Sequence, residues 1–138
     1  MIKIVHAAGG LVQNSFGEYL LIYKNGRWDL PKGQQDNGEA LSVTALREVS
    51  EECGIMGIRL GRWITNTVHS YRLDMDLIFK RTHWYRMFVD GKPIPSPQTE
   101  EGIEKCCWCS LEEAAALLDE SYPSIRRVFR LAMLNHRG

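Results

Sequence analysis

The stretch GQQDNGEALSVTALREVSEECGI, residues 33–55, combines a helical pattern with a high density of glutamates. Residues recurring every three or four positions form one face of this helix: Ser42, Ala45, Leu46, Val49 and Cys53. Gly54 follows, at the place where a residue of left-handed conformation commonly ends a helix. We therefore expect a helix over residues 39–53 that packs against the rest of the protein by one side.

Three of the glutamates lie together beside that face. Glu48, Glu51 and Glu52 stand at i, i+3 and i+4, so they share one edge of the helix. Like charges at this spacing cost about 0.2–0.5 kcal/mol per pair, and Arg47, which borders Glu51, offsets only part of this repulsion. An exposed acidic helix tolerates such a pattern. A hard divalent cation would instead convert the repulsion into coordination by oxygen ligands.

The residues around this edge follow a longer pattern, G-x5-E-x7-R-E-U-x-E-E-x-G-U, in which U is aliphatic. Every specified position matches, at Gly33, Glu39, Arg47, Glu48, Val49, Glu51, Glu52, Gly54 and Ile55. By this motif the sequence resembles the Nudix hydrolase family. The segments AAGGLV (7–12), YLLIY (19–23) and WDLPKG (28–33) are also similar to family segments, so the resemblance covers about residues 4–118.

Strand and helix signals alternate through the rest of the chain. We expect strands at residues 2–12, 17–26, 56–71, 75–91 and 103–110, with loops at 27–38 and 92–102. Ser110 and Glu113 have the spacing of a capping box that opens a second helix, and Pro123 opens a third that runs to His136. This order predicts a single domain over residues 1–138, of the α/β (α+β) class. The resemblance implies an α/β/α sandwich with a mixed β-sheet between helices.

The composition limits the functions that the chain can have. Lys plus Arg and Asp plus Glu each number 17, so the net charge is zero and a stable nucleic-acid complex is not expected. No apolar run is long enough for a membrane span, and we expect a cytoplasmic protein, monomeric or homodimeric. The cysteines, three of them in CCWC, lack the spacing of a zinc site and are expected to be reduced thiols. A redox role for Cys106 and Cys107 stays open.

The resemblance implies a reaction and a set of residues for it. Nudix hydrolases typically cut a phosphoanhydride bond in a nucleoside diphosphate linked to another moiety, using Mg²⁺ or Mn²⁺. By this resemblance Glu48, Glu51 and Glu52 are metal ligands, with Glu48 and Glu52 the safest pair, and Arg47 orients a glutamate. Glu39 is interpreted as a brace between loop and helix, and Gly33 and Gly54 as positions that satisfy backbone needs.

The general base is a separate question. The loop segment QTEEG offers Glu101, with Glu100 as the alternative, and Glu51 is the candidate if neither acts. Three prolines precede this segment, so we expect the loop to be poorly hydrogen-bonded and Glu101 to stand far from the helix in the metal-free protein.

Cations and aromatic residues supply candidates for substrate binding. Lys32, Arg27, Lys80 and Arg86 are candidate phosphate contacts. Trp84 and Tyr85 should point to opposite faces of a strand, so at most one stacks on a base, and Tyr85 is our candidate. His6, His69 and His83 are more typical of structural histidines than of ligands.

Several functions remain in competition. WDLPKG resembles Nudix members that act on dinucleoside polyphosphates or diphosphoinositol polyphosphates, and the first of these is the favoured substrate class. The alternatives are an ADP-ribose pyrophosphatase and a MutT-like nucleoside triphosphate pyrophosphohydrolase. A non-hydrolysing nucleotide sensor is the alternative from another class, and an apolar and acidic interaction module is the third.

Overall fold

A computed structural model describes residues 1–134 of the 138-residue chain. The elements, in chain order, are β1 (Ile2–Gln13), β2 (Tyr19–Lys24), β3 (Arg27–Asp29), β4 (Lys32–Gln34), α1 (Leu41–Cys53), β5 (Arg59–Leu73), β6 (Asp76–Phe88), the 3-10 turn η1 (Thr99–Glu101), β7 (Ile103–Cys109), α2 (Leu111–Leu118) and α3 (Pro123–Leu134). Asn135 and His136, the last two residues of the predicted third helix, lie outside the described residues.

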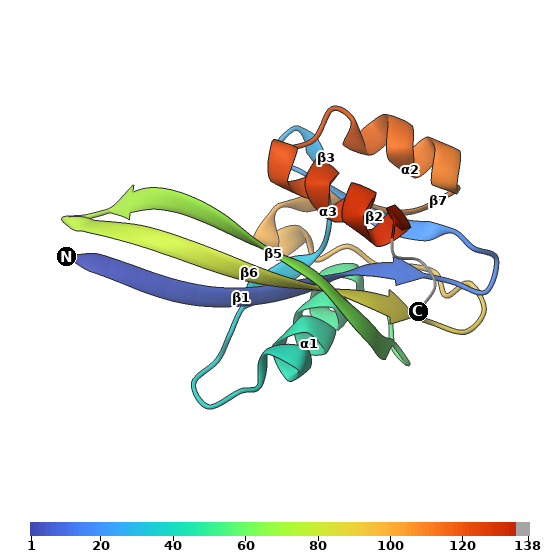
Figure 1. Ribbon diagram of the computed structural model, residues 1–138. Helices are drawn as coiled ribbons and strands as arrows, with labels where there is room; N and C mark the ends of the chain where they lie inside the picture. The colour runs from blue at the N-terminus through green and yellow to red at the C-terminus, as the bar shows by residue number, and fades with distance from the viewer. Residues whose placement is uncertain (135–138) are drawn as a thin grey trace.

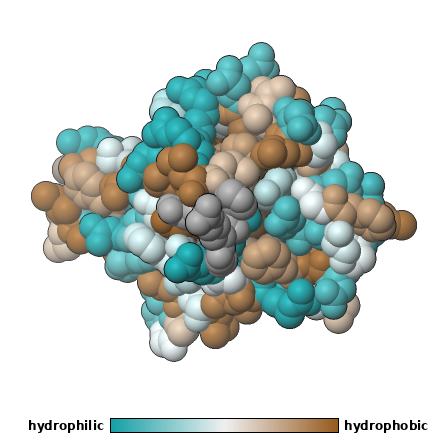
Figure 2. Space-filling model, turned by 45° about the vertical axis from the view of Figure 1, so that its right-hand side comes forward, coloured by the Kyte–Doolittle hydropathy of each residue, from teal (hydrophilic) through white to brown (hydrophobic). Residues whose placement is uncertain are grey.

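The strands form one mixed sheet in the order β3-β2-β1-β6-β5, with β4 paired to β1 and β7 paired to β2. β1 and β6 are parallel along their whole length, from Ile2 opposite Leu77 to Gln13 opposite Phe88, whereas the other pairs are antiparallel. Figure 1 shows that β1, β5 and β6 extend together well beyond the helices. Apolar side chains gather at the end of this extension (Figure 2, left), where Met1, Ile2 and Met75 are exposed.

Helices cover both faces of the sheet, α1 on one side and α2 with α3 on the other (Figure 1). The side chains of β1 alternate between two cores because successive strand residues point to opposite faces. Ala8 and Val12 pack with Ala45, Val49 and Cys53 of α1. Leu11 packs in the second core, which includes residues of α2 and α3. The α/β/α sandwich with a mixed sheet, as predicted, is confirmed.

The predicted ends of the helices are partly correct. Gly54 ends α1 in the left-handed conformation, with φ of 62°, as expected. Ser110 and Glu113 form the predicted capping box of α2. α1 begins at Leu41 instead of residue 39, because Glu39 takes part in the preceding turn, where its backbone N–H donates to the Asp36 carbonyl.

Residues 27–38 were predicted as loop, and this is wrong in two places. Arg27–Asp29 pairs with β2 and Lys32–Gln34 pairs with β1. Each of these strands has three residues, which is too short for an alternating pattern to be visible in the sequence. They are stabilised by hydrogen bonding to the longer strands β1 and β2. The consequence is that Lys32 and Gly33 are held beside β1 instead of in a free loop.

None of the helices within residues 1–134 has the length and apolar character that a bilayer span requires.

Candidate active site

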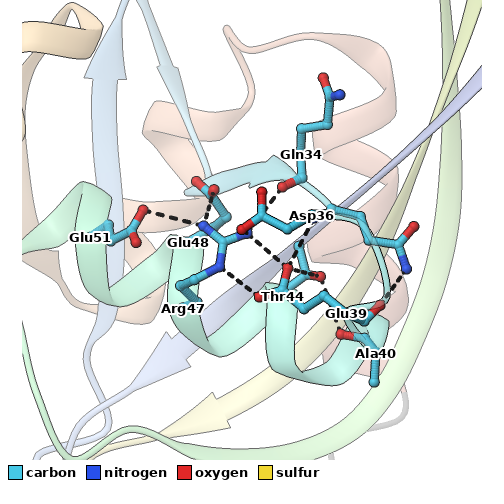
Figure 3. A network of polar contacts seen from close by, with 9 residues as sticks. Gln34, Asp36, Glu39, Ala40, Thr44, Arg47, Glu48 and Glu51 are labelled. Carbon is cyan, nitrogen blue, oxygen red and sulfur yellow. Dashed lines mark hydrogen bonds and ion pairs between the residues drawn. The ribbon is translucent and has the colours of Figure 1, made fainter.

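Arg47 organises the acidic edge of α1 (Figure 3). Its guanidinium donates to Glu39 from Nε at 2.7 Å and from Nη2 at 2.8 Å, and to Glu48 from Nη1 at 2.6 Å. Weaker contacts reach Glu51 at 3.4 Å and the Gln34 carbonyl at 3.1 Å. These interactions raise the pKa of Arg47 and, together with the Thr44 hydroxyl, lower the pKa of Glu39 to about 2. One arginine therefore fixes the positions of several carboxylates.

Glu39 lies between the loop and the helix. Its Oε1 accepts hydrogen bonds from the Asp36 backbone N–H at 3.1 Å and from the Thr44 hydroxyl at 2.7 Å. Its backbone carbonyl accepts from the Gln35 side chain at 2.6 Å. These contacts tie the loop before α1 to the helix, as the predicted brace requires. Both carboxylate oxygens of Glu39 are hydrogen-bonded to residues other than Glu52.

Glu52 differs from the sequence expectation of an exposed edge, because it is only 3% exposed. Its Oε1 accepts a hydrogen bond from the Lys32 backbone N–H at 2.9 Å, and burial raises the pKa of its carboxyl to about 7. The reason is tertiary: β4 lies over this side of α1, and the Cys106 thiol of β7 contacts the Glu52 carbonyl. Burial thus makes the charge of Glu52 costly unless a cation balances it.

Glu48 lies close to Glu52 on the same edge and shares its desolvation. Burial raises the pKa of Glu48, and the Arg47 ion pair opposes this shift only in part. The Glu48 carboxylate reaches over Gly33, where an added Cβ would overlap Oε2. Gly33 is therefore required by the close approach of a carboxylate, which explains the glycine at the start of the motif.

Burial is the main cause of the raised pKa of Glu48 and Glu52, and Glu101 is near enough for its negative charge to add to both shifts. The loop that carries it is tied to the end of α1. Ser96 N–H donates to the Cys53 carbonyl at 2.7 Å and Gln98 N–H to the Glu52 carbonyl at 3.0 Å. The loop is thus anchored to the end of α1 at two points, which the expectation of a poorly hydrogen-bonded loop did not include, whereas the expected distance of Glu101 from the helix stays a prediction.

The donor set of this region suits a hard divalent cation. Glu48 and Glu52 offer desolvated carboxylate oxygens, Glu101 adds negative charge, and Glu51 is exposed at the rim. Within residues 1–134, no group of three or more His, Cys, Asp or Glu side chains is arranged so that it could hold a metal ion by itself.

A cavity of about 470 Å³ opens beside this region, between the sheet and the start of α3. Lys32 connects the two, because its backbone binds Glu52 while its side chain lines the cavity. The ammonium groups of Lys24 and Lys32, together with burial, lower the pKa of Lys80. The lining residues are Lys24, Asn25, Asp29, Lys32, Thr67, His69, Lys80, Thr82, Trp84, Tyr122, Pro123, Ser124 and Ile125. Although the chain has no net charge, three lysines in one cavity give it a locally positive electrostatic potential, which attracts polyanions.

The cavity includes some of the predicted substrate residues and not others. Lys32, Lys80 and His69 line it, and Arg27 lies 4.7 Å over the ring of Tyr122 at its rim. Tyr85 does not line it, since it packs with the core beneath α1. Because the strand alternates, Trp84 is the aromatic residue on the cavity face, its Nε1 donating to the Thr67 hydroxyl at 2.9 Å, and Tyr85 does not reach this cavity.

Other candidates lie away from the cavity. Arg86 is buried and donates to the Ala132 carbonyl at 2.8 Å, so it does not contact a phosphate in this cavity. His6 and His83 form a pair, with Nδ1 and Nε2 3.3 Å apart.

The cysteines are free thiols, as expected. Cys106 packs with the core beneath α1 and Cys107 with the core beneath α2 and α3, so the two point to opposite faces of β7. This geometry disfavours a disulfide between them, because it would require a rearrangement of β7.

Sequence reasoning missed Lys24, Asp29, Thr67, Thr82 and Tyr122 as cavity residues. A signal existed for two of them, because residues 67 and 69 of β5 and residues 80, 82 and 84 of β6 alternate on one face. No sequence signal joins Lys24 or Tyr122 to that face.

Replacing Arg47 with alanine is expected to lower both stability and activity. The change leaves Glu48, 12% exposed, without its cation, at a cost of about 1–3 kcal/mol in the free energy of unfolding, and Glu39 loses the same partner. Urea unfolding checks the first effect and steady-state kinetics the second. Arg130→Ala, an exposed position of α3, is the control. Unfolding and kinetics like those of the control would show that Arg47 has no organising role.

Comparisons with known proteins relate this fold and motif to one family. A family model described as NUDIX domain matches residues 3–132. The chain is similar to an 8-oxo-(d)GTP phosphatase of Mycolicibacterium smegmatis, with 34% identity over 106 residues, which cover 75% of this chain and 29% of that protein. The chain therefore spans less than a third of the length of this relative.

Solved structures share the fold at lower identity. An Ap4A hydrolase of C. elegans, solved as a binary complex, has a TM-score of 0.72 and 22% identity, covering 94% of this chain and 96% of that one. The E. coli dihydroneopterin triphosphate pyrophosphohydrolase has a TM-score of 0.74 and 15% identity, covering 94% and 95%.

Proposed function

The chain belongs to the Nudix family, and from this premise we propose that it is a Mg²⁺-dependent hydrolase that cuts a phosphoanhydride bond in a nucleotide-type substrate. One observation carries the proposal: Lys32 connects the desolvated carboxylates of α1 with a cavity that contains three lysines, because its backbone binds Glu52 while it also lines that cavity. Such a site combines ligands for a hard cation with cations for a polyphosphate.

Each residue of the motif receives a role in this proposal. Glu48 and Glu52 hold Mg²⁺ or Mn²⁺, with Glu51 as an outer ligand, and Arg47 keeps Glu48 in position. When bound, the cation neutralises phosphoryl oxygens and lowers the pKa of a coordinated water. Glu101 accepts a proton from the attacking water, a role supported by the anchoring of its loop to the end of α1 and by the effect of its charge on Glu48 and Glu52.

The cavity residues bind and orient the substrate. Lys32 and Lys80 contact phosphate oxygens, and Arg27 contacts the outer part of the substrate at the rim. Trp84 forms part of the cavity wall. Its indole N–H already donates to the Thr67 hydroxyl, so we assign it an apolar packing surface for the substrate and no hydrogen bond to it. A nucleoside with part of its phosphate chain is a suitable occupant, since ligand cavities of about 300–1,000 Å³ bury most of a small molecule.

Dinucleoside polyphosphates are the substrate class that we favour. Three lysines match a chain of several phosphates better than the single diphosphate of ADP-ribose. WDLPKG at residues 28–33 resembles the form found in that branch, and one protein of the same fold is an Ap4A hydrolase.

A nucleoside triphosphate is the second candidate substrate. It is favoured by the 34% identity to an 8-oxo-(d)GTP phosphatase.

The decisive experiment measures phosphate and pyrophosphate release with Mg²⁺ over four substrate classes: dinucleoside polyphosphates, nucleoside triphosphates, ADP-ribose and nucleotide sugars. We expect the highest kcat/KM with dinucleoside polyphosphates. A higher value with an oxidised nucleoside triphosphate would select the second candidate. Tight nucleotide binding without release of any product would instead identify a sensor and refute hydrolysis.

Replacing Lys80 with glutamine is expected to raise KM at least about tenfold, because a charge-assisted phosphate contact contributes about 1.5–3 kcal/mol. kcat should change much less, since this contact is made to substrate and transition state alike. Lys92→Gln, which removes an exposed ion pair with Glu18, is the matched control. Equal KM values for the two variants would remove Lys80 from the substrate site.

A further inference from the structure

A second cavity, of about 290 Å³, lies between β5, β6 and the end of α3. Its lining residues are Arg62, Trp63, Ile64, Arg86, Leu131 and Ala132. None of these residues lines the lysine cavity, so within the described part of the chain the two cavities have separate walls.

Arg86 is the buried charge of this second cavity. It is 5% exposed, and its Nη1 donates to the Ala132 carbonyl at 2.8 Å. Across residues 1–134 no carboxylate pairs with it, and Nε and Nη2 have no protein acceptor although no buried polar side-chain atom lacks a partner. These two nitrogens are therefore not sealed from solvent, and the cavity that Arg86 lines is the open space beside this side chain. The other contact of the guanidinium is with the ring of Phe88, whose centroid lies 6.0 Å from Cζ. A buried guanidinium with one neutral carbonyl and one aromatic ring as partners is costly, and an anion would lower this cost.

The elements around the cavity are strongly basic. β5 and α3 contain no Asp or Glu, while their arginines are Arg59, Arg62, Arg72, Arg126, Arg127 and Arg130. The chain as a whole has a net charge of zero, so this basic character is local. Arg62 is exposed and makes no ion pair within the described residues, in contrast to Arg59, which pairs with Asp90 at 2.9 Å. The second guanidinium of the cavity is thus available.

Trp63 adds a flat apolar surface at the entrance. Its side chain is 55% exposed, and its Nε1 donates to the Asn66 side chain at 3.1 Å, which fixes the ring. An aromatic surface next to two guanidinium groups suits a molecule that joins an anionic group to a planar or apolar one.

We propose that this cavity binds the phosphate group of a small phosphorylated molecule, between the guanidinium groups of Arg62 and Arg86, at a site distinct from the lysine cavity. Guanidinium groups recognise phosphate through paired, charge-assisted hydrogen bonds, and two of them balance a phosphate dianion. The volume and the enclosure of Arg86 favour a single phosphate group over a nucleic-acid strand. This inference does not depend on the proposed hydrolysis.

The test uses the ¹⁵N-labelled full chain without divalent metal, titrated with inorganic phosphate at constant ionic strength. The indole N–H of Trp63, assigned with Trp63→Phe, reports on this cavity, whereas that of Trp84 reports on the lysine cavity. We expect a saturable shift of Trp63 that Lys80→Gln leaves unchanged. Arg62→Ala should weaken the binding at least about tenfold and Arg62→Lys less, because a charged hydrogen bond is lost or kept.

Arg72→Ala is the matched control, since it removes an exposed arginine from the same strand outside the cavity. AMP should produce the same Trp63 shift as phosphate, and acetate a much weaker one. Equal effects of Arg62→Ala and Arg72→Ala, or equal shifts with acetate and phosphate, would overturn the proposal. Saturable binding of a short single-stranded oligonucleotide without a phosphate response would also overturn it, in favour of a nucleic-acid surface.

Discussion

Replacing Glu52 with glutamine is expected to lower kcat at least about a hundredfold, because a metal ligand supplies several kcal/mol of transition-state stabilisation. The change keeps the volume of the side chain and the hydrogen bond from the Lys32 backbone, so the fold should be preserved. The measurement is the rate of product release at saturating Mg²⁺ with the best substrate of the panel.

The same substitution is expected to stabilise the metal-free protein. The folded-state pKa of Glu52 is about 7, against an ordinary value of 4.5, so the folded chain holds this proton more tightly than the unfolded chain. Stability therefore falls as pH rises from about 4.5 to about 7, and above that range the buried charge costs on the order of 3 kcal/mol. Glutamine carries no charge and avoids this cost.

Urea unfolding in the presence of a chelator, at pH 5 and at pH 8, measures this effect. We expect Glu52→Gln to exceed the wild type in stability at pH 8 and to match it more closely at pH 5. Glu104→Gln, at an exposed position of β7, is the control. A kcat lowered less than tenfold would remove Glu52 from the metal site, and a variant less stable than the wild type at pH 8 would refute the assigned cost of its charge.

The second large effect is expected at Glu101. A general base contributes typically about 10²–10⁴-fold, so Glu101→Gln should lower kcat within that range, whereas Glu100→Gln should change it little. The two residues are neighbours in η1 and both are exposed, which makes them a matched pair. Of these two neighbours, only Glu101 carries a charge that adds to the effect of burial on the pKa of Glu48 and Glu52.

Parallel measurement of both variants at saturating Mg²⁺ distinguishes the possibilities. A large loss for Glu100→Gln alone would transfer the role to that residue. Near-normal kcat for both would move the base to α1, where Glu51 is exposed beside Arg47.

The sequence predicts the sheet, the helices and the acidic edge because these depend on local periodicity. The motif residues of α1 repeat with the helix, and Gly54 has the conformation that its position indicates. The burial of Glu52 was not predictable in the same way. A helical wheel places Glu52 beside the apolar face of α1. The strands that cover Glu52, β4 and β7, lie elsewhere in the sequence, so the pattern of the helix does not reveal its burial.

The cavity residues likewise divide into those that local sequence predicts and those that only the fold brings into the cavity. Lys32 and Lys80 were predicted from charge alone, and the choice between Trp84 and Tyr85 required knowing which core each face meets. Tyr122 and Lys24 enter the cavity only through the placement of α3 and of the turn after β2. Arg86 was a candidate phosphate contact, and its distance from the lysine cavity follows from the packing of α3, which no local pattern encodes.

The parallel pairing of β1 with β6 sets an order of events during synthesis of the chain. β1 is made first, yet each of its residues pairs with one about 75 positions further along. Contacts this far apart in sequence form late, because closing the intervening chain costs entropy. α1 packs on β1, so the helix that carries the carboxylates is complete on the ribosome well before the strand beneath it has its parallel neighbour. Until the residues of β6 have emerged, that edge of β1 lacks its native partner, and an unpaired strand edge is open to pairing with another chain.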